Sequence, residues 1–119
     1  MSAILSVGRN LRNQELLAEF LEPHGFRVLA VYTLEEFDRA LERPQAYRAA
    51  LVDLSGYDRR IWQRCERLRA AGVPFAVIAP RPERLGAAGK AAEHGVADRV
   101  LAKPLAKDAL LAIVRDLAL

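Results

Sequence analysis

The stretch Ala49-Ala50-Leu51-Val52-Asp53-Leu54 is an apolar run that is too short for a helix and that carries one carboxylate near its end. It does not alternate regularly between polar and apolar residues, which is typical of a strand covered on both faces of a parallel sheet. Similar runs lie on either side of it, separated by intervals long enough for one crossover helix and two short loops. These runs are Ala3–Val7, Val28–Tyr32, Pro74–Ala79 and Val100–Ala102.

The intervals between the runs carry apolar residues at helical spacing, together with signals for helix ends. Thr33-Leu34-Glu35-Glu36 has the form of a capping box, with Thr33 as the N-cap and Glu36 at the third helical position. Pro23-His24-Gly25 is typical of the residues just past a helix. The fourth interval, Leu85 to Glu93, contains two interior glycines and predicts the least stable helix.

Five strand–helix units predict one α/β domain over residues 1–119. We expect a doubly wound, five-stranded parallel sheet with five helices on its two faces, which is a flavodoxin-like three-layer sandwich. In such a sheet the functional crevice lies outside the carboxyl ends of the strands. The residues directly after each apolar run are therefore the candidates for a site.

Composition limits the class of protein. The chain has 119 residues, 52% of them apolar, and a formal net charge of +3. Its lone cysteine, Cys65, can form no intramolecular disulfide, which favours a reducing compartment and predicts a cytoplasmic protein. The first apolar run stops at Gly8-Arg9, far short of a membrane span, so no membrane partner is expected.

A carboxylate and an ammonium are predicted to meet at the crevice. Asp53 ends the third apolar run, and Lys103-Pro104 follows the fifth. Two interpretations are open: an ion pair at the sheet edge, or a nucleophilic carboxylate whose phosphoryl group the lysine would neutralise.

At these residues the sequence resembles the receiver domain of two-component response regulators, over essentially the whole chain. Leu51-Val52-Asp53-Leu54 is similar to the strand that carries the phosphoacceptor aspartate, and Ile4–Val7, followed by Asn10, is similar to the first strand. Pro74–Ile78 resembles the fourth strand, and Leu101–Leu105 resembles the fifth with its Lys-Pro signature. The resemblance implies that Asp53 stands at the phosphoacceptor position, with Lys103 and Pro104 as the conserved-type pair, whose peptide bond is typically cis in the family.

The sequence also departs from the family pattern at the positions that would hold Mg²⁺ and the phosphoryl group. Gly8 and Arg9 stand where the family has two acidic residues, and a hard divalent cation needs oxygen ligands. Ala79 replaces the switch Ser or Thr, and Val100 replaces the aromatic switch residue. We therefore expect Mg²⁺ binding to be weak or absent and no cofactor to be held.

The leading hypothesis is an atypical receiver, or pseudo-receiver, that signals through protein–protein contacts without phosphorylation. One alternative is a true phosphoacceptor modified on Asp53 by a histidine kinase or phosphotransfer partner. Another is an anion-binding or small-ligand flavodoxin-like module that uses Arg9 and Lys103. An enzyme is not expected, because the sequence contains no GxGxxG, Walker or GxSxG motif and no nucleophile–histidine pair.

Arg9 could act in one of two ways. Its guanidinium could pair with Asp53 and fill the volume of a metal, or it could point into solvent.

The expected partner is a protein: a histidine kinase, a phosphotransfer protein or an output domain. The resemblance places the contact face on the fourth helix, fifth strand and fifth helix, with Lys90, Asp98 and Arg115, and a homodimer is compatible with it. Arg60, Arg64 and Arg67 are interpreted as a solvated helix face, so direct nucleic-acid binding is not expected. Cys65 is predicted to be a small buried hydrophobe.

Overall fold

The computed structural model describes residues 2–79, 99–103 and 105–119. Strands and helices alternate along this part of the chain, with two short 3₁₀ helices at Glu22–His24 and Pro44–Ala46. The strands are β1 (Ser2–Val7), β2 (Phe26–Val31), β3 (Ala49–Asp53), β4 (Phe75–Ala79) and β5 (Arg99–Ala102). The helices are α1 (Leu11–Leu21), α2 (Leu34–Leu41), α3 (Arg60–Ala70) and α5 (Lys107–Leu117).

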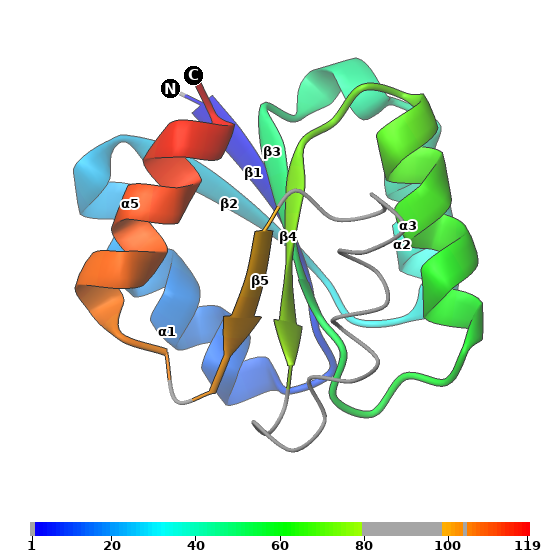
Figure 1. Cartoon of the computed structure of the whole chain (residues 1–119), viewed down its shortest axis with the longest axis horizontal. Coiled ribbons are helices and arrows are strands. Elements are labelled where there is room, and N and C mark those ends of the chain that lie inside the picture. Colours follow the sequence, from blue (N-terminus) through cyan, green and yellow to red (C-terminus); the bar gives the residue numbers. More distant parts are fainter. Residues whose placement is uncertain (1, 80–98, 104) are drawn as a thin grey trace.

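The five strands form one parallel sheet in the order β2-β1-β3-β4-β5. Helices α1 and α5 lie on one face, and α2 and α3 lie on the other (Figure 1). The strand order reverses at β1, whose neighbours are β2 and β3. The carboxyl ends of β1, β3 and β4 therefore border the crevice in which doubly wound sheets hold their sites.

Each face of the sheet is covered by its own apolar core. The core under α2 and α3 contains Phe37, Leu68 and Phe75, all nearly inaccessible to solvent. The core under α1 and α5 contains Leu21 and Val114. Burial of both faces explains why the strands lack polar–apolar alternation.

The structure confirms the α/β fold class and all five predicted strands, with their bounds shifted by one or two residues. The capping box is present: the Glu36 N–H donates to Thr33 Oγ1 at 3.1 Å, and Glu36 Oε1 accepts from the Thr33 N–H at 3.1 Å. Four helices of eight residues or more are found in the described part of the chain, and the fourth predicted helix, with Lys90, lies outside it.

Asp98 and Pro104 also lie outside the described residues, whereas Arg115 is exposed on α5. Among the helices that the structure describes, none has the length and apolar character needed to cross a membrane. Cys65 is buried in the core under α3, as predicted.

Candidate functional site

Asp53 and Lys103 meet at the carboxyl edge of the sheet. Asp53 is the last residue of β3 and Lys103 follows β5, so the pair spans β4, whose Ala79 carbonyl accepts the Lys103 N–H at 3.2 Å. Lys103 Nζ lies 2.7 Å from Asp53 Oδ2, and the side chains are 27% and 16% exposed, respectively. The Ser55 N–H donates to Asp53 Oδ1 at 3.0 Å. Both carboxylate oxygens therefore have a partner, and the carboxylate remains reachable from solvent.

Gly8 lies beside this carboxylate, in a space that Gln14 fills. Gln14 is only 4% exposed, and its Nε2 donates to the carbonyls of Ser6 (2.9 Å), Gly8 (3.3 Å) and Val31 (3.2 Å). The Ser6 hydroxyl donates to Gln14 Oε1. A Cβ atom at position 8 would lie 3.3 Å from Gln14 Nε2 and 3.5 Å from Asp53 Cβ. A larger side chain at position 8 would therefore have to displace Gln14.

Sequence reasoning missed Gln14. The apolar stripe Leu16-Leu17-Phe20-Leu21 predicts the buried face of α1. Leu16 is nevertheless 46% exposed, and Gln14 is buried instead. The signal was available, because Gln14, Leu17 and Leu21 are spaced three and four residues apart and so share one helix face. A buried amide is tolerated there because it is fully hydrogen-bonded.

Arg9 does not pair with Asp53. Its Nη1 donates to the Gly56 carbonyl at 3.3 Å, and its Cζ lies 5.8 Å from the centroid of the Tyr57 ring. No ion pair joins Arg9 to Asp53 within residues 2–79, so the pairing hypothesis is wrong. Arg9 follows β1 and is exposed, but its side chain packs against the loop after β3 instead of extending freely into solvent. The positive φ of Gly56 (82°) helps to shape that loop.

Tyr57 anchors the same loop. Its hydroxyl donates to the Tyr32 carbonyl at 2.7 Å. Burial raises the pKa of Tyr57 to about 12, an effect that the nearby Arg9 charge partly offsets. Tyr57 and Arg9 thus connect the ends of β1 and β2 with the β3–α3 loop.

The two switch positions carry apolar side chains. Ala79 ends β4 and is fully buried. Because alanine has no hydroxyl, the side chain at this position offers no hydrogen-bond donor to Asp53. Val100 on β5 is partly buried and packs against the core under α2 and α3.

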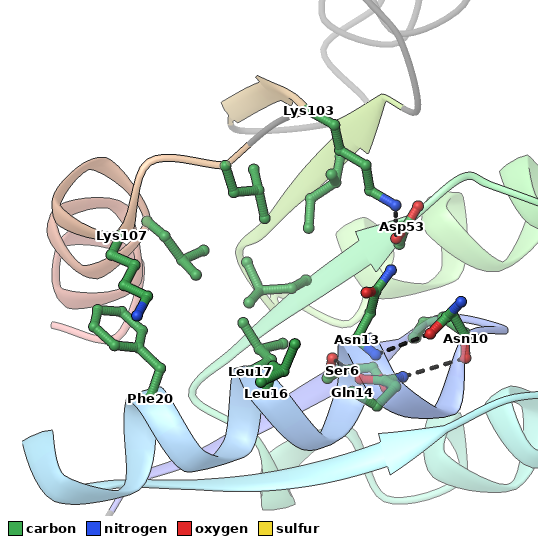
Figure 2. Close-up of a pocket in the computed structure, with 16 residues that line it drawn as sticks. Ser6, Asn10, Asn13, Gln14, Leu16, Leu17, Phe20, Asp53, Lys103 and Lys107 are labelled. Atoms are coloured by element: carbon green, nitrogen blue, oxygen red, sulfur yellow. Dashed lines mark hydrogen bonds and ion pairs between the residues drawn. The ribbon is translucent and has the colours of Figure 1, made fainter.

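The site offers few of the oxygen ligands that a divalent cation prefers. Among the described residues, no group of three or more His, Cys, Asp or Glu residues could hold a metal ion. The polar groups around Asp53 include the Lys103 ammonium, the Ser55 N–H and the Asn13 amide, and none of them is a second carboxylate (Figure 2). These groups are poorly suited to hold a divalent cation in addition to the Lys103 ammonium.

A groove leads away from the Asp53–Lys103 pair, between α1 and α5 (Figure 2). Its volume is about 660 Å³. Apolar side chains from both helices, from the segment before α5 and from the sheet form most of its wall, and Lys107 stands at the far end with Nζ 5.9 Å from the Phe20 ring centroid. The apolar wall consists of Val7, Leu16, Leu17, Phe20, Leu51, Ile78, Leu105 and Leu110.

Three arginines of α3, Arg60, Arg64 and Arg67, form ion pairs with aspartates. Arg64 forms two hydrogen bonds with Asp38 of α2, Nε to Oδ1 at 3.0 Å and Nη2 to Oδ2 at 3.0 Å. Arg67 Nη1 lies 3.1 Å from Asp38 Oδ1, and Arg60 Nη2 lies 2.9 Å from Asp58 Oδ2. Hydrogen bonds from Arg60 lower the pKa of Asp58 to about 2. These contacts neutralise much of the basic stripe, in agreement with a solvated helix face.

The solved structures that resemble this chain include several receiver domains. The receiver domain of a sensor histidine kinase from Pseudomonas aeruginosa, which holds a magnesium ion in its active-site cleft, is 26% identical with a TM-score of 0.79, and the match covers 98% of this chain and 97% of that one. A two-component response regulator from Clostridium difficile is 23% identical with a TM-score of 0.82, with 98% and 95% covered. A response regulator receiver domain from Clostridium thermocellum is 15% identical with a TM-score of 0.84, with 99% and 94% covered.

No family model and no curated protein sequence matches the chain. The structural matches nevertheless extend over nearly the whole chain at high TM-scores. The fold is that of response-regulator receiver domains, as the resemblance in the sequence implies.

Proposed function

We propose that this chain, which has the receiver fold, is a signalling module that acts through protein–protein contacts and does not depend on Mg²⁺-dependent phosphorylation of Asp53. The observation that carries the proposal is the environment of the Asp53 carboxylate. Lys103 lies 2.7 Å from one oxygen, Gly8 supplies no ligand, and Gln14 fills the adjoining space.

Charge balance supports this proposal. Phosphoryl transfer to a carboxylate brings more negative charge to the site, which bound cations ordinarily neutralise. In the family two acidic residues after the first strand help to hold Mg²⁺, and here those positions are Gly8 and Arg9. Arg9 contacts Gly56 and Tyr57 and forms no ion pair with Asp53 within residues 2–79. Lys103 is then the one cationic side chain that contacts Asp53 among the described residues.

The expected partner is a histidine kinase, a phosphotransfer protein or an output domain. Of the predicted contact residues, Arg115 is exposed on α5 and available to a partner. The face that includes Lys90, Asp98 and Arg115 remains our proposal for this contact, and a homodimer could use it too. We propose no enzymatic activity and no cofactor.

A second candidate is a phosphoacceptor that works with an unusual metal arrangement. One observation favours it: Asp53 keeps a lysine partner and is 16% exposed, so a phosphoryl donor could reach it. The two proposals make opposite predictions for metal and phosphoryl analogues.

The deciding experiment is an NMR titration of the ¹⁵N-labelled chain, first with Mg²⁺ and then with beryllofluoride. We expect the amide signals of Asp53, Ser55 and Lys103 to shift no more than in a NaCl titration at matched ionic strength. The variant Asp53→Asn provides the control, because it removes the acceptor. Large saturable shifts in the wild type that Asp53→Asn abolishes would establish the second candidate and overturn the first.

A further inference from the structure

The α1–α5 groove has the dimensions of a ligand site. Its volume of about 660 Å³ falls in the range of roughly 300–1,000 Å³ that is typical of small-molecule pockets. Leu16, Leu17 and Phe20 line it from α1, and Leu105 and Leu110 line it from the other side. Leu16 is 46% exposed, so apolar surface stays in contact with water at the rim.

Three charged side chains line the groove, and only two of them form an ion pair with each other. Lys103 and Asp53 pair at 2.7 Å and compensate each other at one end. Lys107 stands at the other end over the Phe20 ring, and no carboxylate pairs with it in residues 2–79, 99–103 and 105–119. The groove therefore combines apolar walls with one uncompensated positive charge.

We propose that this groove binds a small amphipathic acid, a molecule with an apolar ring or chain and one anionic group. The anionic group would lie next to Lys107, because the charge of Lys103 at the opposite end is already compensated by Asp53. The apolar body would cover Leu16, Leu17 and Phe20. Figure 2 shows that the Asn13 side chain points toward Asp53, so an uncharged polar group of the ligand could hydrogen-bond there.

Such a ligand would contact the Asp53–Lys103 pair directly, since both residues line the groove. Occupancy of the groove could then change this edge of the sheet without a phosphoryl group. The proposal goes beyond the signalling function proposed above and does not require it. It also differs from the anion site predicted with Arg9, because Arg9 lines a separate, smaller hollow with Tyr57 and Arg60.

The test uses two probes with the same apolar body and opposite charge, 2-naphthoate and 2-naphthylmethylammonium. Their dissociation constants are measured by NMR titration of the ¹⁵N-labelled chain. We expect 2-naphthoate to shift the amide signals of Leu17, Lys103 and Lys107 saturably. We expect the ammonium probe to bind at least about threefold more weakly, as is typical of one exposed charge pair.

Two variants with matched controls locate the site. Lys107→Met keeps an unbranched apolar side chain and removes the charge, so it should weaken 2-naphthoate about threefold and abolish the preference between the probes. Arg69→Met, which removes a positive charge at an exposed position of α3 outside the groove, should leave binding unchanged.

Leu16→Glu should weaken 2-naphthoate about tenfold, because it removes apolar contact and adds repulsion. Leu11→Glu is its control, since Leu11 is 59% exposed on α1 and does not line the groove. Far-UV circular dichroism and urea unfolding verify that each variant is folded.

Equal affinity for the two probes, or binding that Lys107→Met and Leu16→Glu leave unchanged, would overturn the proposal. So would light scattering that shows a wild-type dimer dissociated by Leu16→Glu, because the groove would then be covered by a second copy of the chain. Loss of binding in these two variants, with a monomer throughout and intact binding in the controls, would establish it.

Discussion

Replacing Gln14 by leucine tests the most deeply buried polar contact near the site. The Gln14 amide is 4% exposed, donates to three backbone carbonyls and accepts the Ser6 hydroxyl. Leucine fills a similar volume and restores none of these hydrogen bonds. The Ser6 hydroxyl and the Gly8 carbonyl would then lose their partner. The Val31 carbonyl keeps the Gly8 N–H at 3.0 Å, and the Ser6 carbonyl stays within β1, which is paired with β2 and β3 at this residue.

The magnitude follows from these two groups. A buried polar group without a partner costs about 1–3 kcal/mol, and the added apolar burial of leucine recovers about 1 kcal/mol. We therefore expect Gln14→Leu to lower the free energy of unfolding by about 2–4 kcal/mol, a large part of the roughly 5–15 kcal/mol available to a domain. Urea unfolding followed by circular dichroism measures this change.

Two further variants make the test specific. Gln63→Leu places the same substitution at an exposed position of α3 and should change the free energy of unfolding by less than about 0.5 kcal/mol. Adding Ser6→Ala to Gln14→Leu should cost less than the two single changes together, because it removes the orphaned hydroxyl. The reasoning fails if Gln14→Leu is no more destabilising than Gln63→Leu, or if the double variant is strictly additive.

Three other predictions concern an ion pair, a helix cap and the cysteine. A double-mutant cycle on Asp38→Asn and Arg64→Met should give a coupling of about 1 kcal/mol in urea unfolding, because Arg64 is only 18% exposed and bonds Asp38 through two nitrogens; a coupling of zero would contradict this. Hydrogen bonds from the N–H of Tyr32 and then from that of Thr33 lower the pKa of Glu36 below its ordinary 4.5. The Glu36 carboxylate therefore stabilises the folded chain above pH 4.5, and this stabilisation is lost as the pH falls through the lowered pKa. The difference in unfolding free energy between wild type and Glu36→Gln should thus be full at pH 7 and shrink in acid, and a difference independent of pH would be evidence against the cap. Burial raises the pKa of Cys65 to about 12, so the folded chain should resist a thiol reagent at pH 8 and react once unfolded in urea; rapid reaction of the folded chain would show that the thiol is accessible.

The main features of the fold could be predicted because each depends on short stretches of sequence. Apolar runs without alternation mark buried parallel strands, and the Thr33–Glu36 pattern marks a helix start that the structure shows with both hydrogen bonds. Asp53 and Lys103 could be placed at one crevice because parallel strands deliver their carboxyl ends to the same edge.

The features that escaped prediction depend on contacts between distant residues. The direction of Arg9 is set by Gly56 and Tyr57, which lie far along the chain on another loop. The groove exists because of the way α1 and α5 pack on the sheet, and no local pattern encodes that spacing. Gln14 belongs to neither class: its helix face was readable from the sequence, but its polarity suggested a solvent-facing position.

The contact between Arg9 and Gly56 makes the conformation of the β3–α3 loop depend on the residue at position 9. A Cβ atom on residue 56 would lie 2.9 Å from Arg9 Cδ, and the positive φ of this residue adds strain for any side chain. Glycine at position 56 accommodates either a short or a long side chain at position 9. A side chain at position 56 would therefore displace the Arg9 side chain from its present place. A side chain at position 56 should therefore release Arg9 from Tyr57 as well, so that the β3–α3 loop and the end of β1 would change together.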